Sequence, residues 1–249
     1  MKKLFIPIFC LFLSSCAVSN YYQLFTASSD GGKFENKNIV FNDANCTVSY
    51  NLWSDGGNIG FNIYNKTDND LELDLTKTFF VYNGVSYEYF QNRTFTKSSG
   101  STSTQTYSYY RFITNSNTSI NGVSTSVIEK PMLTIPPKTS INVADFNIVN
   151  TRFISCDLTR YPTSRTIKTM VYNKANSPIN FYNIISYTIK GETNRFENRF
   201  YIDEITNYPS NMMFNIVDTN ICGGRLSPYV SVLKFSSPNK FYFKYAIDK

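Results

Sequence analysis

Apolar and polar residues alternate along most of this 249-residue chain, and such alternation predicts β-strands. Every second residue is apolar from 46 to 52 and again from 59 to 63, with the turn sequence Ser-Asp-Gly-Gly between them at 54–57. Two alternating segments joined by a turn are predicted to pair as an antiparallel hairpin.

The dipeptide Asn83-Gly84 indicates a second hairpin. The flanking segments, 79–82 and 85–90, are rich in aromatic and β-branched residues, as strands are. Asn-Gly is the strongest short signal for a two-residue hairpin turn, because both of its positions need a positive φ. The topology predicted for this part of the chain is therefore antiparallel and local.

Leu71, Leu73 and Leu75 alternate with Glu72 and Asp74. A strand buried on one face has this pattern, so we expect the leucines in the core and both carboxylates in solvent. No segment shows a capped run of helical period, and little helix is expected. Further strands of the same kind are predicted at 132–135, 141–148, 167–172, 179–189, 196–205, 212–217, 229–235 and 241–247.

The composition changes between residues 92 and 126, where Ser, Thr and Asn dominate. The stretch 97–104 contains only Lys, Ser, Thr and Gly. Such low-complexity polar segments are typical of loops. We predict a long excursion from the fold with a single strand at 107–113.

Short strands separated by turn signals predict an all-β fold, with an antiparallel β-sandwich as its architecture. Residues 38–150 contain the Asn-Gly hairpin and a Pro-Pro turn before their closing strand, and they resemble immunoglobulin-like domains of exported bacterial proteins. The β-rich C-terminal part, 151–249, is expected to pack on this domain or to form a second small domain.

The first residues of the chain have the order of an export signal, with two lysines, an apolar run at 4–13 and two serines. Leu13-Ser14-Ser15-Cys16 is similar to the lipobox of bacterial lipoproteins. That resemblance implies cleavage between Ser15 and Cys16 and a diacylglycerol on the Cys16 thiol. Residues 1–15 would be the signal peptide and 16–37 the lipidated tether and first strand. An ordinary secretory leader that carries a cysteine is the alternative.

The segments 50–58 (Tyr-Asn-Leu-Trp-Ser-Asp-Gly-Gly-Asn) and 177–181 (Ser-Pro-Ile-Asn-Phe) resemble a group of gut-bacterial lipoproteins to which no activity is assigned. This resemblance implies location and fold only. In related lipoproteins an acidic run after the cysteine is associated with export to the cell surface, and residues 17–20 have no acidic residue. We therefore expect an outer-membrane lipoprotein exposed to the periplasm, with surface display as the alternative.

The charge balance excludes some partners. The 24 Lys and Arg residues exceed the 18 Asp and Glu residues by six, and two of the lysines belong to the leader. This excess is too small and too evenly spread to predict nucleic-acid binding. No run of five basic residues is present, so the lipid rather than a polybasic segment is expected to hold the membrane.

Cysteine and histidine content limits the chemistry. Cys46, Cys156 and Cys222 would enter a compartment where disulfides persist, and they allow one bridge, three pairings and one remaining thiol. The remaining unpaired cysteine is a candidate for a catalytic thiol. However, the chain has no histidine, which excludes Ser-His-Asp and Cys-His catalysis and zinc sites of the usual His-containing kinds. No cofactor and no metal are expected.

Three other patterns could carry chemistry, and each has a simpler explanation. The segment 237–240 matches S-x-x-K of penicillin-recognising enzymes, but Pro238 indicates a turn and no K-T-G partner is present. Asp203 and Glu204 are adjacent in a predicted strand and should face opposite ways, unlike a glycosidase pair. The segment 68–70 lacks the glycine and late glutamate of a calcium loop. No catalytic residue is predicted.

Aromatic residues offer one hypothesis for a binding site. Flat rings placed side by side cover the apolar face of a sugar. The candidates for such a glycan platform are Trp53, Tyr107, Tyr109 and Tyr110, together with Tyr87 and Tyr89. Packing in the core is the alternative for most of them. The function predicted is a non-enzymatic, lipid-anchored module that binds or braces a partner in the envelope, an unknown protein or glycan. The alternative is a glycan-binding lipoprotein displayed at the cell surface.

Overall fold

The structure is a computed structural model that describes residues 19–108, 114–143, 146–217 and 230–247, and for residues 95–127 within these ranges it describes the backbone only. Its regular elements are antiparallel strands and one short helix, α1 (Ser210–Met213), which confirms the all-β fold class. The strand predicted from residue 212 starts later, because α1 precedes β16 (Phe214–Val217). No helix among the described residues is long and apolar enough to cross a membrane.

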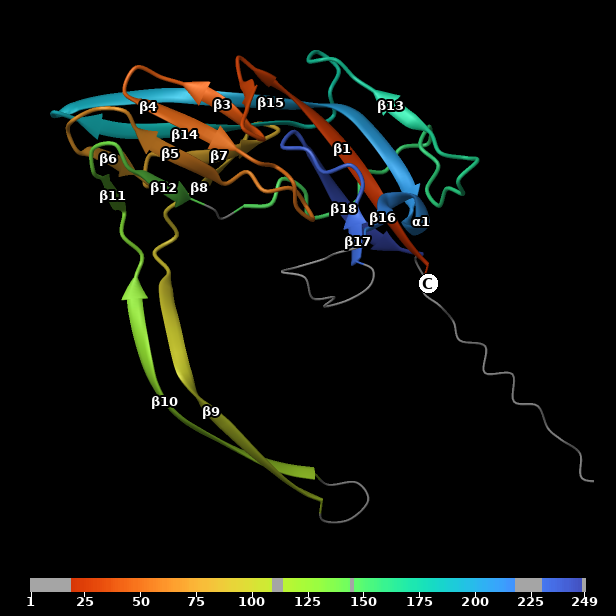
Figure 1. Cartoon of the computed structure of the whole chain (residues 1–249), viewed down its shortest axis with the longest axis horizontal. Helices are drawn as coiled ribbons and strands as arrows, with labels where there is room; N and C mark the ends of the chain where they lie inside the picture. The colour runs from red at the N-terminus through yellow and green to blue at the C-terminus, as the bar shows by residue number, and fades with distance from the viewer. Residues whose placement is uncertain (1–18, 109–113, 144–145, 218–229, 248–249) are drawn as a thin grey trace, which may run out of the picture.

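One sheet has five strands in the order β12-β5-β4-β3-β2 (Figure 1). Its core is the predicted hairpin, in which Val48 pairs with Ile63 and Tyr50 with Phe61. The strands are β2 (Lys33–Glu35), β3 (Asn38–Asn42), β4 (Cys46–Tyr50), β5 (Phe61–Asn65) and β12 (Ser140–Val143). Burial alternates strictly along β4, so this sheet presents one apolar face.

The second sheet has nine strands, six of them in the path β11-β6-β14-β15-β1-β18. Two further strands, β7 and β13, pair with β14 and β15, and β8 pairs with β7. The bounds are β1 (Asn20–Asp30), β6 (Leu71–Asp74), β7 (Phe79–Tyr82), β8 (Val85–Glu88), β11 (Met132–Ile135), β13 (Thr169–Val171), β14 (Asn180–Ile189), β15 (Glu192–Pro209) and β18 (Lys240–Ala246). The long strands β1 and β15 bend together at one end of the body (Figure 1).

The apolar faces of the two sheets pack on each other. Val48 and Ile63 of the smaller sheet belong to the same buried cluster as Leu73, Phe181 and Ile202 of the larger one. This packing gives the sandwich architecture. The sheet order also mixes the two predicted parts of the chain, because strands from both sides of residue 150 share the nine-stranded sheet and the core.

The Asn-Gly hairpin is confirmed. Asn83 and Gly84 have φ values of 46° and 86°, as a turn with two positive φ angles requires. Tyr82 pairs with Val85 across this turn.

The burial of Asp74 differs from the prediction for the segment 71–75. Its leucines are buried and Glu72 is exposed, as predicted, but Asp74 is buried too. Its carboxylate accepts hydrogen bonds from the Thr76 backbone N–H (3.0 Å) and hydroxyl (2.6 Å) and pairs with Lys77 (3.1 Å). Burial alone would raise the pKa of Asp74, but these contacts outweigh it and lower the pKa. Asp74 is buried because its carboxylate bonds Thr76 and Lys77 in the turn that follows β6.

The Ser/Thr-rich segment is the largest departure from the prediction. Instead of an excursion with one strand, it contains β9 (Thr94–Ser108) and β10 (Thr114–Ile128), which pair in continuous register from Thr94↔Ile128 to Ser108↔Thr114. Figure 1 shows the pair leaving the body as a two-stranded ribbon, called the ribbon below. Threonine favours strands, and antiparallel pairing satisfies the backbone even where the side chains are small and polar.

Candidate functional site

Trp53, the first residue of the predicted glycan platform, is half-buried. Its ring lies 5.3 Å from the ring of Tyr242, and it packs against a small core cluster of Tyr22, Leu24 and Met213. One face of the indole thus packs against other side chains of the protein. Trp53 therefore supports the fold next to β18.

The predicted tyrosines do not gather in one place within the described residues. Tyr107 lies in β9, but its side chain is outside the description, and Tyr109 and Tyr110 lie outside the described residues altogether. Tyr89 is fully buried, whereas Tyr87 is 44% exposed. Among the side chains of this set that the structure describes, that of Tyr87 is the most exposed.

An aromatic groove surrounds Tyr87, and no pattern in the sequence predicts it. It has a volume of about 500 Å³ and lies between the β7–β8 hairpin and the segment 146–154. The rings of Phe80 and Tyr87 stack at 6.0 Å, and those of Phe80 and Phe146 at 5.5 Å. Asn147, Asn150, Thr151 and Arg152 add polar groups to the lining, together with the aromatic side chains Tyr82 and Phe153. The groove thus combines flat rings with hydrogen-bonding groups.

The groove carries one cation, the Arg152 guanidinium, and is otherwise lined by uncharged groups. Burial raises the pKa of Tyr82, with a smaller contribution from Tyr87, so its hydroxyl stays protonated at neutral pH. The described residues of the lining contain amides, the hydroxyls of Tyr82, Tyr87 and Thr151 and a guanidinium, but no carboxylate, lysine or cysteine. This arrangement offers hydrogen bonds and ring contacts, and it brings together no acid and base pair.

The carboxylates and the serine considered for catalysis have structural partners. The Ser28 hydroxyl donates to Asp203, and the Thr26 hydroxyl donates to Glu204, so both acids are tied to β1. The Ser237 hydroxyl donates to Asn239 at 2.6 Å within a turn. These contacts explain the side chains as parts of the sheet and of the turn before β18.

The predicted disulfide is not formed between the two cysteines that the structure describes. Cys46 is buried and Cys156 is exposed, and both carry free thiols. Burial, with a smaller contribution from Asp43, raises the pKa of Cys46 to about 12. A thiol with such a pKa is protonated at neutral pH and is a poor nucleophile. Cys222 and the predicted lipidation and cleavage residues, Cys16 and Ser15, lie outside the described residues.

Alkylation should separate the two free thiols. In iodoacetamide at pH 8, Cys156 should react at the rate of an ordinary exposed thiol, while Cys46 should react at least ~100-fold more slowly because it is buried and almost wholly protonated. Peptide mass spectrometry over time gives both rates in the native protein and after denaturation. Equal native rates would contradict the burial of Cys46.

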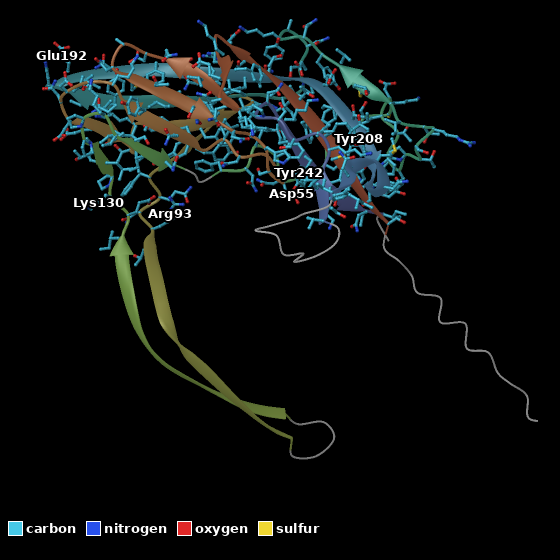
Figure 2. The ribbon with its side chains drawn as sticks, in the orientation of Figure 1. Asp55, Arg93, Lys130, Glu192, Tyr208 and Tyr242 are labelled. Carbon is cyan, nitrogen blue, oxygen red and sulfur yellow. The ribbon has the colours of Figure 1, made fainter. Side chains whose placement is uncertain are left out.

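A carboxylate clamp holds the base of the ribbon. The Glu129 carboxylate, 9% exposed as a residue, accepts the backbone N–H groups of Gln91 (2.9 Å) and Arg93 (3.1 Å) and also pairs with the Arg93 guanidinium. The backbone N–H of Glu129 donates to the Arg93 carbonyl at 2.8 Å. Figure 2 shows Arg93 and Lys130 where the two strands meet the body. The clamp joins the two strands of the ribbon to each other where they leave the sandwich.

The clamp should depend on the charge of Glu129. Burial alone would raise its pKa, but the hydrogen bonds from Arg93 and Gln91 outweigh burial and lower it. The stabilisation is therefore present above the ordinary pKa of a glutamate and is lost as pH falls through the lowered value. Glu129→Ala should remove it at pH 7 and speed hydrogen exchange at the Gln91 and Arg93 amides by roughly 10-fold or more. The exposed Glu88→Ala should change neither amide, and an unchanged rate in Glu129→Ala would contradict the clamp.

Comparisons with known proteins do not extend this picture. No family model matches the chain, and neither the curated proteins nor the solved structures contain a match. The function must therefore be inferred from the chain's own residues and geometry.

Proposed function

We propose that the protein is a non-catalytic lipoprotein of the cell envelope, held on the membrane by lipid on Cys16, that binds an envelope protein through the ribbon. The observation that carries this proposal is the ribbon itself. Each of its strands has 15 residues, so it extends ~50 Å. In the described part of the chain, β9 pairs with β10 and with no other strand.

A ribbon of this kind is suited to binding a partner through its strand edges. An isolated two-stranded hairpin is at most marginally stable in water. Both of its outer edges offer backbone N–H and C=O groups to which another strand can be added. The clamp at Glu129 joins the two strands at the base of the ribbon and so holds the pair together where it leaves the sandwich. We therefore assign partner binding to the edges of the ribbon.

The leader supports the envelope location. The lipobox resemblance of Leu13-Ser14-Ser15-Cys16 implies two or three acyl chains on Cys16, and two chains are enough for lasting attachment. A membrane-attached body with an extended ribbon can contact a protein tens of ångströms away.

Crosslinking in intact cells tests the ribbon. A photoreactive amino acid is placed at Ser101 or Ser103 of the ribbon, or at Phe34, a 62% exposed residue of the body, as the matched control. The proposal expects one envelope protein, identified by mass spectrometry, to be crosslinked from the ribbon positions and not from Phe34. Equal crosslinking from all three positions, or none from the ribbon, would contradict it.

The aromatic groove favours a second candidate function, glycan binding. The rings of Tyr87 and Phe146, 6.1 Å apart, suit the apolar face of a sugar, and the amides of Asn147 and Asn150 suit its hydroxyl groups. Chitohexaose and maltohexaose are suitable calorimetric probes. Tyr87→Ala should weaken binding of either sugar by roughly 10-fold, whereas Tyr64→Ala on the other sheet should leave it unchanged. If the wild-type protein binds neither sugar, this candidate fails.

A further inference from the structure

The tether between the lipid and the folded body is short. This inference rests on the proposed lipid anchor at Cys16. Only three residues separate Cys16 from Asn20, the first residue of β1. An extended chain spans at most ~3.6 Å per residue, so Asn20 lies within ~15 Å of the anchored cysteine. The end of the body at which β1 begins must therefore lie close to the bilayer.

Apolar side chains are exposed at this same end. Pro209 pairs with Tyr21 of β1, α1 follows directly, and β16 then pairs with β17 (Val230–Leu233). Ile216 on this hairpin is 73% exposed, and Ile247, just after β18, is 48% exposed. Val217, Val230 and Val232 of the hairpin are exposed as well. Figure 1 shows α1, β16, β17 and the end of β18 around the start of β1.

Tyrosines and cations lie at the same end, on the other face of the sheet, because Tyr21 points away from Tyr22, whose ring contacts Phe214 at the start of β16. The Tyr21 ring is 5.3 Å from Tyr161 and 5.6 Å from Tyr245, which it stacks upon. The Arg160 and Arg152 guanidiniums lie over the rings of Tyr161 and Tyr245, at 5.2 and 4.9 Å. Tyrosine is enriched at the membrane–water interface, and arginine binds phosphate groups.

The excess of positive charge at this end comes from the segment 151–168, whereas Lys244 and Asp55 offset each other. Lys244 is exposed, and its backbone N–H donates to the exposed carboxylate of Asp55 at 3.2 Å. The segment 151–168 that carries Arg152 and Arg160 has four Lys and Arg residues and one acidic residue. Figure 2 shows Asp55, Tyr208 and Tyr242 at this end of the body, away from Arg93 at the base of the ribbon.

We propose that this end of the body docks on the bilayer and binds the phosphates of anionic phospholipids. The membrane-docking surface comprises Tyr21, Arg160, Tyr161, Ile216, Val232 and Ile247. Its exposed aliphatic side chains enter the interfacial layer, its tyrosines lie at the level of the headgroups, and its cations face the phosphates. Docking fixes the orientation of the body and leaves the base of the ribbon at the opposite end, away from this contact.

Radical footprinting of the lipidated, full-length protein in vesicles tests the docking. Three proteins are compared in phosphatidylethanolamine–phosphatidylglycerol vesicles: wild type, the surface variant Ile216→Asp/Ile247→Asp, and the control variant Phe34→Asp/Tyr64→Asp. The proposal expects oxidation of Tyr161 to rise several-fold in the surface variant and to stay at the wild-type level in the control. Thermal unfolding of all three proteins shows whether the variants are folded.

A second measurement leaves the protein unchanged. Replacing phosphatidylglycerol by phosphatidylcholine should raise Tyr161 oxidation in the wild type, while oxidation of Phe34 stays constant. Equal Tyr161 oxidation in wild type and surface variant would overturn the docking surface, as would protection that depends on protein density, which indicates a second copy. Intact mass of the same samples separates the two proposals, because absent acyl chains contradict the anchor rather than the docking surface.

Discussion

Replacing Tyr50 by alanine is expected to lower the free energy of unfolding by about 4 kcal/mol and the melting temperature by roughly 10 °C. Tyr50 is 1% exposed and lies between the sheets, with its ring 5.2 Å from Phe200 and 5.8 Å from Phe41. Its hydroxyl accepts hydrogen bonds from the side-chain amides of Asn198 (2.8 Å) and Asn183 (3.4 Å). The variant therefore leaves a large cavity and two buried amides that each lose an acceptor.

Two further variants separate the contribution of the Tyr50 hydroxyl from that of its ring and provide an exposed tyrosine for comparison. Tyr50→Phe keeps the ring and removes only the hydroxyl, and it should cost about 1–2 kcal/mol. Tyr64→Ala removes a tyrosine that is 37% exposed, and it should cost less than ~1 kcal/mol. Chemical denaturation of the three variants gives the loss in the free energy of unfolding for each. Equal losses for Tyr50→Ala and Tyr64→Ala would contradict the place of Tyr50 in the core.

Replacing Gly57 by alanine should be the second most damaging change, at about 3 kcal/mol. Gly57 has a φ of 74°, and a Cβ there would lie 2.7 Å from the Phe241 ring and 2.9 Å from Ile148. Phe241 is fully buried and stacks on Phe25 at 4.8 Å, so its ring has little room to move. The new methyl group thus adds a steric clash to the backbone strain.

Gly84→Ala is the matched control for the clash. Gly84 has a φ of 86°, and no atom lies within 4 Å of the position that a Cβ would take. Its replacement should cost only the backbone strain, about 1 kcal/mol. The difference between the two alanine variants in denaturant measures the packing of Gly57 against Phe241. Equal losses would contradict the close approach in the core.

Local patterns of the chain predicted much of the fold. The Asn83-Gly84 turn and the alternation from 46 to 52 identified both hairpins, because turn geometry and burial on one face are set by neighbouring residues. The all-β class followed from the same patterns. The mixing of strands from both halves of the chain in one sheet could not be predicted, since strand order depends on contacts between distant residues.

The ribbon and Asp74 show where local patterns fail. Between 94 and 128 there is little apolar alternation, because a ribbon that leaves the body has no core face to bury. The pattern therefore predicted a loop. The alternation of apolar and polar residues placed Asp74 on the solvent face, but its hydrogen bonds with Thr76 and its ion pair with Lys77 permit burial.

The candidate site was predicted only in part. Tyr87 was among the aromatic residues considered, but its partners Phe80 and Phe146 come from different segments of the chain. Phe146 belongs to the segment 141–148, for which one strand was predicted, but β12 ends at Val143, and no sequence signal placed Phe146 beside the Asn-Gly hairpin. Grooves formed by loops depend on tertiary contacts, and a sequence pattern does not reveal them.

The anchor at Cys16 is the central claim about function, and it is tested most directly by intact mass and membrane fractionation of wild type beside Cys16→Ala, both expressed in a Gram-negative host. Wild type is predicted to lose residues 1–15, to gain the mass of two or three acyl chains and to fractionate with membranes. Cys16→Ala is predicted to stay uncut and without acyl chains. Identical masses and fractionation of the two proteins, apart from the substitution, would contradict the lipoprotein account.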